Sequence, residues 1–495
     1  MDHRILSFPF LMLSLLLPFV FELLKIWKKS NNNPPPGPWR LPLIGNIHQL
    51  GGRHQPHLRL TDLARTYGPV MRLQLGQIEA VVISSAETAK QVMKTQESQF
   101  LGRPSLLAAD IMLYNRTDIS FAPYGDYWRQ MKKIAVVELL SAKRVQAYKS
   151  VMDEEVSNFI NFLYSKAGSP VNLTKTFYSL GNGIIAKTSI GKKFKKQETF
   201  LKVVDKAIRV AGGFSVGDAF PSFKLIHLIT GISSTLHTAH QEADEILEEI
   251  ISEHRASKTA DGDDYEADNI LGVLLDIQER GNLQVPLTTD NIKAIILDMF
   301  AGASDTSLTT AEWAMAEMVK HPRIMKKAQD EVRRTLNQEG NVANLLPELK
   351  YLKLVIKETL RLHPPVALIP RECDGRCELN GYDVNPKTKI LVNAWAIGRD
   401  HNLWNDPERF DPERFLDNSS DFRGTDFKFI PFGAGKRICP GITMAITIIE
   451  VLLAQLLYHF DWKLPDGAKP ESLDMSDTFG LVVKRRIDLN LIPIP

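Results

Sequence analysis

The sequence predicts a mainly α-helical body with small β-sheets, preceded by an apolar N-terminal anchor. Long amphipathic segments dominate from about residue 86 onward, whereas the strand-like segments are short. The segment from Asp290 to Val319 would span about 45 Å at the helical rise of 1.5 Å per residue, enough to cross the whole body. After the N-terminal region, no linker or internal repeat divides the chain of 495 residues.

The N-terminal region carries an apolar run without charge from Ile5 to Phe21, and apolar residues continue beyond Glu22. Its length approaches the roughly 20 residues with which a helix crosses a bilayer. A cleaved signal peptide is the main alternative. No small-x-small cleavage site follows, and the lysines after the run favour a cytosolic location for that end. We therefore expect an uncleaved anchor over 1–24, a basic and proline-rich linker over 25–38, and a catalytic domain over 39–495.

The elements of the catalytic domain follow from periodicity. The segment 70–84 alternates around Gly76 and is rich in β-branched residues, which predicts strand structure. Apolar residues at helical spacing predict helices at 126–140, 146–166, 236–257, 290–319, 323–338 and 347–362. Shorter strand-like segments return at 379–393 and 480–493. Thr289 is the expected N-cap of the long helix, and His321-Pro322 ends it.

Composition argues against several classes of function. The net charge is +2 and the basic runs are short, so nothing favours a nucleic-acid partner. The three cysteines are too few, and odd in number, for a disulfide framework. Such sparing use of cysteine in a long chain fits a reducing compartment.

A glycine-rich segment around Cys439 is the strongest chemical signal. It reads Phe-Gly-Ala-Gly-Lys-Arg-Ile-Cys-Pro-Gly from Phe432 to Gly441. Glycines on both sides leave room for a macrocycle, and backbone N–H groups there can hydrogen-bond a thiolate. The apolar stretch that follows predicts a helix whose N-terminus favours a negative sulfur. Without such surroundings, a buried cysteine is more often a small hydrophobic residue than a ligand.

The glycine-rich segment and the other two cysteines do not meet the sequence requirements of three other kinds of site. Ile438 stands where the third glycine of a dinucleotide-binding fingerprint belongs. Arg437 stands where a phosphate-binding loop needs serine or threonine. Cys373 and Cys377 are too isolated to complete a four-ligand zinc site.

Five motifs, in order along the chain, resemble those of the cytochrome P450 family. The segment 357–361, Lys-Glu-Thr-Leu-Arg, is similar to the family's E-x-x-R helix, and 412–415, Pro-Glu-Arg-Phe, to its later arginine motif. The segments 127–129 and 301–306 also fit, and the spacing agrees from about Pro34 to Leu491. The cysteine segment is similar to the family's haem-binding loop at Phe432, Gly435, Arg437, Cys439 and Gly441.

The resemblance implies a haem-thiolate monooxygenase that binds heme b, iron protoporphyrin IX, with Cys439 as the axial ligand of the iron. Asp305 and Thr306 match the acid–threonine pair that delivers protons for cleavage of dioxygen, although Ala303 stands where glycine is usual. The implied cofactor contacts are Trp128, Arg129, Lys132, Arg371, Phe432, Gly435, Arg437 and Gly441. The implied structural triad is Glu358, Arg361 and Arg414. The segment 407–410 repeats the sequence Pro-Glu-Arg-Phe, but its position implies that it does not supply the triad arginine.

The resemblance also implies a substrate pocket. Its expected lining is Leu106, Ile111, Phe121, Ile296, Phe300, Val366, Leu368, Ile369, Phe479 and Leu481. These side chains carry no charge, and the amino-acid sequences of the motifs most resemble those of plant terpenoid hydroxylases. We therefore expect a terpenoid substrate. Flavonoid, alkaloid and fatty-acid substrates remain open, as do a haem-thiolate isomerase or dehydratase and a haem sensor.

No flavin or nicotinamide motif is visible in the chain, so the electrons must come from a partner. The resemblance implies an NADPH–cytochrome P450 reductase that docks on a basic face with Lys132 or Lys133, and cytochrome b5 is a further candidate. The expected location is the endoplasmic reticulum membrane, with the catalytic domain cytosolic. The apolar stretch 214–232 is a second candidate membrane contact, with ordinary core as its alternative.

Overall fold

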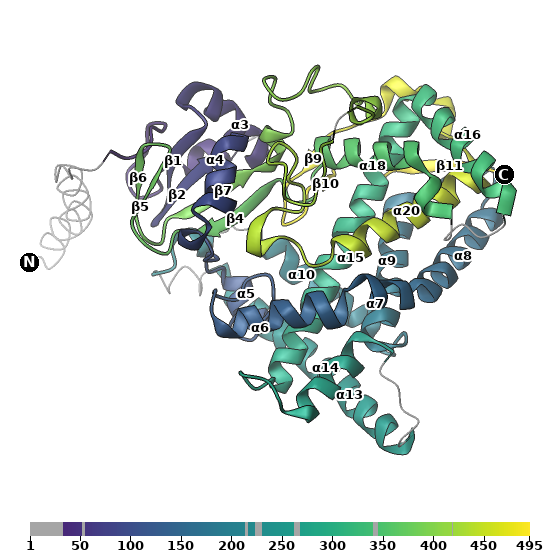
Figure 1. Cartoon of the computed structure of the whole chain (residues 1–495), viewed down its shortest axis with the longest axis horizontal. Helices are drawn as coiled ribbons and strands as arrows, with labels where there is room; N and C mark the ends of the chain where they lie inside the picture. Colours follow the sequence, from purple (N-terminus) through teal and green to yellow (C-terminus); the bar gives the residue numbers. More distant parts are fainter. Residues whose placement is uncertain are drawn as a thin grey trace, which may run out of the picture.

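A computed structural model describes residues 33–51, 55–212, 216–222, 230–261, 268–339, 345–417 and 419–495. The expected anchor lies outside these residues, as do most of the linker and the parts 214–215 and 223–229 of the 214–232 stretch. The described chain is mainly helical with four small sheets, which confirms the predicted fold class. The four-stranded sheet lies at one end of the body, and helices with the smaller sheets among them form the rest (Figure 1).

The helix α15 (Thr289–Lys320) runs through the middle of the body and organises the fold (Figure 1). It packs against α9 (Leu173–Ile190) and α20 (Ile442–His459), and most of its residues are buried. The expected N-cap is wrong by one residue. Thr288 caps the helix instead, because its hydroxyl accepts the N–H of Asn291 at 3.2 Å while the Asn291 side chain accepts the N–H of Thr288 at 3.0 Å.

The other predicted helices are also helical in the structure. They are α6 (Asp126–Ile134) with the π-helical turn η3 (Ala135–Leu139), α8 (Lys149–Ser165), α13 (Ile232–Asp261), α16 (Pro322–Glu339) and α18 (Lys350–Leu362). The prediction missed α3 (Pro56–Tyr67), α9, α10 (Gln197–Val210) and α14 (Ile270–Arg280). A reason is visible for α9, which is buried on nearly every face and so lacks the polar stripe of an amphipathic helix. Shorter helices are α2 (Ile47–Leu50), α4 (Ala86–Lys90), α5 (Leu107–Met112), α7 (Ala142–Ala147), α11 (Val216–Ala219) and α19 (Ala394–Ile397).

The largest sheet has the strand order β1-β2-β7-β4. The predicted strand region 70–84 forms a hairpin, because Gly76 adopts a φ of +61° between its two antiparallel strands. The strands of this sheet are β1 (Val70–Leu75), β2 (Ile78–Ile83), β4 (Leu368–Glu372) and β7 (Lys389–Asn393). The small sheets join β5 (Cys377–Leu379) with β6 (Tyr382–Val384), β9 (Asp477–Thr478) with β10 (Lys484–Arg485), and β3 (Val171–Asn172) and β8 (Asp461–Lys463) with β11 (Asn490–Ile494).

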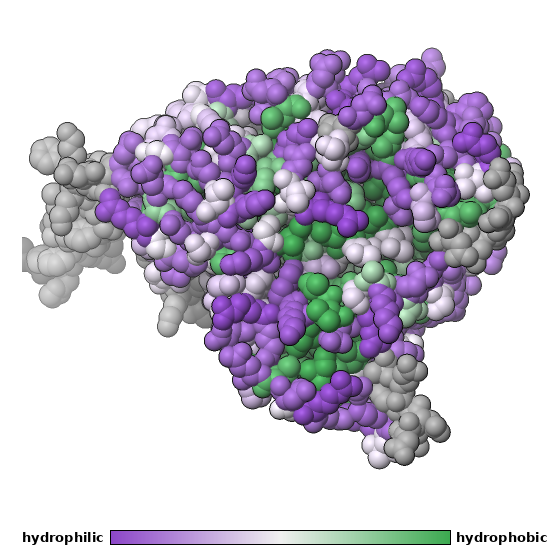
Figure 2. Space-filling model, viewed as in Figure 1, coloured by the Kyte–Doolittle hydropathy of each residue, from purple (hydrophilic) through white to green (hydrophobic). Residues whose placement is uncertain are grey.

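The helix α20 is the one helix among the described residues that is long and apolar enough to span a membrane. Half of its apolar window is buried, and it packs on α15 and α16. It therefore belongs to the interior. Figure 2 shows a largely hydrophilic face, with hydrophobic side chains gathered around α6 and α14.

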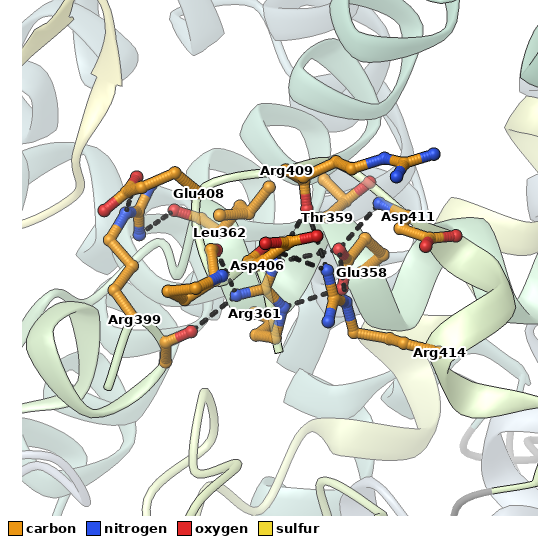
Figure 3. A network of polar contacts seen from close by, with 12 residues as sticks. Glu358, Thr359, Arg361, Leu362, Arg399, Asp406, Glu408, Arg409, Asp411 and Arg414 are labelled. Carbon is orange, nitrogen blue, oxygen red and sulfur yellow. Dashed lines mark hydrogen bonds and ion pairs between the residues drawn. The ribbon is translucent and has the colours of Figure 1, made fainter. Parts of the chain in front are cut away.

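A buried ion-pair network fixes the chain after α18 (Figure 3). Arg361 donates two hydrogen bonds to the Glu358 carboxylate, at 2.7 and 2.8 Å, and Arg414 donates a third at 2.9 Å. Glu358 and Arg361 are fully buried, and Arg414 is 10% exposed. The remaining donors of the two arginines bind carbonyl oxygens of Gly398, Asn405, Asp406, Pro407 and Arg409. The structure thus brings the three triad residues together.

The segment 407–410 joins this network only through its backbone. The carbonyl oxygens of Pro407 and Arg409 accept hydrogen bonds from the triad arginines. The side chain of Glu408 pairs instead with Arg399 at 3.1 Å, and it is 63% exposed. The two similar motifs therefore have different environments.

Glu358→Gln should lower the free energy of unfolding by about 3–5 kcal/mol, because it leaves two buried arginines without their counter-charge. Glu408→Gln is the matched control and should cost less, because Glu408 is 63% exposed and the largely buried Arg399 keeps its hydrogen bond to the Leu362 carbonyl. Urea unfolding followed by far-ultraviolet circular dichroism measures both. Equal losses in the two variants would contradict a special role for the buried network.

Candidate active site

A cavity of about 340 Å³ lies between α15 and the loop that carries Cys439. This volume falls within the range of about 300–1,000 Å³ that is usual for small-molecule sites. The helices α5, α10 and α15 contribute to its wall, together with the segments 365–370, 431–441 and 481–482. Most of the lining is apolar, and the chemically active side chains are few.

Glycines shape the loop around Cys439. Gly433 and Gly435 adopt φ values of +71° and +70°, and a Cβ on Gly435 would lie 2.1 Å from the carbonyl oxygen of Met93. The N–H of Cys439 donates to the Phe432 carbonyl at 3.0 Å. The N–H of Gly441 donates to the sulfur of Cys439 at 3.4 Å. The loop therefore holds the thiol in a defined place on the cavity wall.

The electrostatics of Cys439 combine two opposing effects. Burial raises the pKa of the thiol, while the N–H of Gly441 and the ammonium of Lys132 lower it. Lys132 also donates a hydrogen bond to the carbonyl of Ile438, next to the cysteine. The surroundings thus offer a hydrogen bond and a positive charge to a thiolate, and a metal that binds the sulfur would favour that form further.

Four positively charged side chains converge beside the cavity: Arg103, Lys132, Arg371 and Arg437. Burial lowers the pKa of Arg103 to about 10, of Lys132 to about 8 and of Arg437 to about 9, and it also lowers the pKa of Arg371. Repulsion from neighbouring arginines adds to this effect for Lys132, Arg371 and Arg437. A buried cluster of cations is a site for an anion.

Arg437 shows most directly where such an anion would bind. Its Nε donates to the Leu101 carbonyl at 3.0 Å and one terminal nitrogen donates to the Ala122 carbonyl at 2.7 Å. The other terminal nitrogen is buried and has no hydrogen-bond partner among the described residues. The guanidinium lies over the ring of Trp128, 4.2 Å from its centroid. An apolar cavity with a thiol on its wall and an unsatisfied buried cation fits a haem with carboxylate substituents.

The expected cofactor contacts divide into three groups. Arg371 is buried next to the cavity and donates to the Ala434 carbonyl at 3.5 Å, and Gly435 lies in the turn of the loop. Arg129 lies elsewhere, because its side chain is 57% exposed and pairs with Asp126. The residues that line the cavity are Trp128, Lys132, Phe432, Arg437, Cys439 and Gly441.

Arg103 is a cavity residue that the sequence analysis missed. Its Nε donates to the Ser120 carbonyl at 2.9 Å, and another donor binds the Pro370 carbonyl. It comes from an irregular segment that belongs to none of the five motifs. No signal in the sequence marked it, and only its spatial convergence with Lys132 and Arg437 reveals it.

The expected substrate pocket is partly rearranged. Phe121, Val366, Ile369 and Leu481 line the cavity. Phe300 instead packs on Phe200, with ring centroids 5.0 Å apart. Leu106, Ile111, Ile296, Leu368 and Phe479 also lie outside the lining. The face of α15 that lines the cavity carries Leu297, Asp298, Met299, Ala301 and Gly302, whereas Ile296 and Phe300 pack into the core.

Asp298 is an acidic residue in this otherwise apolar wall. Its carboxylate accepts the backbone N–H groups of Ile119 and Ser120 at 3.1 and 3.2 Å, and the Ser120 hydroxyl at 2.6 Å. Burial raises the pKa of Asp298, and burial together with repulsion from Asp298 raises the pKa of Asp118 to about 8. This acid therefore ties the 118–121 segment to α15.

The acid–threonine pair is split between two faces of α15. Thr306 lines the cavity, and its hydroxyl donates to the Gly302 carbonyl at 2.7 Å. Asp305 does not line the cavity but forms an ion pair with Lys484 at 2.6 Å. Successive residues of a helix point about 100° apart, which explains the split. Ala303 lies on the cavity side with Thr306.

Comparisons with known proteins agree on one family. The family model described as "Cytochrome P450" matches residues 34–489. A cytochrome P450 named 726A27, from Euphorbia lathyris, is 57% identical over 96% of each chain. Premnaspirodiene oxygenase from Hyoscyamus muticus is 48% identical over 99% of this chain and 98% of its own length. Melianol synthase from Citrus sinensis is 46% identical over 98% and 96%, respectively.

Solved structures show the same fold. A zebra fish cytochrome P450 with progesterone superposes with a TM-score of 0.77, at 23% identity, and covers 90% of this chain and all of its own. A second zebra fish structure, with abiraterone, has a TM-score of 0.74 at 24% identity.

Arg437→Met should weaken haem retention strongly, because it removes a buried donor and a positive charge from the cavity wall. Arg129→Met is the matched control and should retain haem as the wild type does, because Arg129 is exposed. The ratio of Soret to protein absorbance after size-exclusion chromatography measures retention. Equal haem content in wild type and Arg437→Met would contradict the assignment of the cationic cluster.

Proposed function

Because the chain belongs to the cytochrome P450 family and is therefore a haem-thiolate monooxygenase, we propose that Cys439 binds its haem iron and that the cavity accepts a terpenoid. The observation that carries the proposal is the convergence of Cys439 with two buried and two partly buried cations at one apolar cavity. Arg103, Lys132, Arg371 and Arg437 would bind the two haem carboxylates, and Trp128 would support Arg437.

The bound haem supplies the redox chemistry that inserts one atom of dioxygen into a substrate and reduces the other atom to water. The chain supplies binding, orientation and protons. Phe121, Val366, Ile369 and Leu481 form an apolar wall that excludes water and holds a hydrophobic substrate. The hydroxyl of Thr306, on the cavity wall, would hold a proton donor that Asp305 recharges from the other face of α15.

A terpenoid substrate is supported by two independent lines. Two relatives carry names that contain terpenoids, premnaspirodiene and melianol. The cavity wall near Leu481 and Val482 carries no charge, which suits a hydrocarbon skeleton. The reaction class would be hydroxylation or epoxidation. A panel that also contains flavonoids, alkaloids and fatty acids tests the alternatives, because the substrate should shift the haem spin state and yield a product that requires NADPH and reductase.

Electrons reach P450 enzymes from a redox partner, and we propose a membrane-bound NADPH–cytochrome P450 reductase for this chain. Its docking surface would include Lys133, which is exposed at the end of α6, and the exposed Val136 and Val137 beside it. Lys132 is less suited, because its ammonium binds the Ile438 carbonyl. The apolar N-terminal run would anchor the enzyme in the endoplasmic reticulum membrane with its catalytic domain in the cytosol. Cytochrome b5 is the second candidate electron donor.

Cys439→Ser should abolish the red-shifted ferrous–carbonyl Soret band and NADPH-dependent product formation, because a hydroxyl cannot replace a thiolate as electron donor to iron. Cys377→Ser is the control, because this second cysteine belongs to the strand β5 and not to the cavity lining. Difference spectra of the reduced, carbonyl-bound proteins provide the measurement. A red-shifted band that survives in Cys439→Ser would assign the ligand to another residue.

Thr306→Ala should still bind haem and substrate but should release more peroxide and less product per NADPH. General acid catalysis contributes about 10²–10⁴-fold, and part of this should appear as lost product. Thr306→Ser keeps the hydroxyl and should preserve the ratio of product to NADPH. Wild-type coupling in Thr306→Ala would show that protons arrive by another route.

A further inference from the structure

The carboxylate of Asp305 is buried on the side of α15 away from the cavity and is held there by one cation. Asp305 is 5% exposed, and the ammonium of Lys484 lies 2.6 Å from its Oδ2. Lys484 itself is 34% exposed, so the pair connects the interior to solvent. The ring of Tyr178, on α9, lies 5.9 Å from the same ammonium.

Other charged groups face this place from α10. Asp205 and Arg209 form an ion pair at 2.7 Å, and both interact with Tyr178. Burial raises the pKa of Tyr178 and the hydrogen bond with Asp205 raises the pKa of Arg209, and the charge of Asp305 adds to both effects. Of these groups, Lys484 forms the ion pair with Asp305. It is therefore the group that fixes the carboxylate.

The fold holds the backbone of Lys484 firmly. The next residue, Arg485, is buried, donates to the Asp474 carbonyl at 2.6 Å and lies over the ring of Trp313. On the other side, the N–H of Val483 donates to the Pro365 carbonyl at 2.8 Å. The preceding residues, Leu481 and Val482, line the cavity. The segment 481–484 thus forms part of the cavity wall and also places Lys484 beside Asp305 on the far side of α15.

We propose that Lys484 is a positioning residue for proton delivery: its ammonium holds Asp305 at the solvent side of α15, where the acid takes up protons from bulk water and passes them to Thr306. The inference rests on the proposed relay role of Asp305 and Thr306. The step is a proton transfer without change of oxidation state. Each proton comes from water, and each transfer returns Asp305 to its carboxylate form beside Lys484.

Lys484→Met keeps the length of the side chain and removes its charge. It should lower the ratio of oxygenated product to NADPH by about three- to tenfold, a fraction of the about 10²–10⁴-fold that general acid catalysis contributes. It should also enlarge the solvent deuterium isotope effect on product formation, which a merely structural defect would not do. Lys484→Arg restores the charge and should recover coupling to within about twofold, because an arginine at the same place can also bind a carboxylate.

A double-mutant cycle tests whether Lys484 acts through Asp305. The variant with both Lys484→Met and Asp305→Asn should match Asp305→Asn alone. The role of Lys484 is refuted, and the relay stands, if the losses in the ratio of product to NADPH multiply in the double variant. The same conclusion follows if Lys484→Met has the wild-type ratio while Asp305→Asn has a lower one. If Asp305→Asn itself couples like the wild type, the proposed relay fails.

Amine labelling of the holoenzyme without NADPH tests the ion pair independently of turnover. Lys484 should react with an acetylating reagent several-fold faster in Asp305→Asn than in the wild type, as followed by peptide mass spectrometry. Lys175 is the internal control, because it is 77% exposed and should label equally in both. Equal labelling of Lys484 in the two proteins would show that the pair does not form in solution and would overturn the inference.

Discussion

Positive charge buried beside an apolar cavity is the constraint on which the active site depends. Moving one cation out of water costs several kcal/mol even after relaxation, and Arg103, Lys132, Arg371 and Arg437 all approach the same place. Burial lowers the pKa of Lys132 to about 8, and repulsion from the three arginines adds to this effect. Two carboxylates of a haem would turn this repulsion into attraction. Binding of the cofactor and stability of the cavity wall are therefore coupled.

The rotation of α15 about its own axis decides which of its side chains face the cavity and which face away from it. Ala301, Gly302, Ala303 and Thr306 give its cavity face a stretch of short side chains, Phe300 packs into the core, and Asp305 lies toward Lys484. A flat cofactor can approach a helix only where side chains are small, while the helix still needs large apolar contacts to stay in the core. One helix thus separates the Thr306 hydroxyl on the cavity wall from the buried Asp305 carboxylate beside Lys484 by a rotation of about 100°.

The sequence was sufficient for the family, the fold class and the helices with a clear apolar stripe. A local motif also singled out Cys439, and the structure places this cysteine on the cavity wall. The sequence was insufficient where a residue reaches the cavity, or fails to reach it, because of how distant segments pack together. Arg103 has no motif around it, Arg129 stands in a motif yet points to solvent, and Phe300 is one helical face away from the cavity. Helical phase and loop placement depend on packing partners that are distant in the sequence, so residue types alone could not assign these side chains.

The central claim is that the cationic cluster binds the carboxylates of the haem. The most direct measurement compares reconstitution of the apoprotein with haem and with its dimethyl ester, in which both carboxylates are neutral. The structure predicts tight binding of haem and much weaker binding of the ester, with the difference reduced in Arg437→Met. Equal affinity for the two compounds would contradict the claim, because the buried cations would then have some other counter-charge.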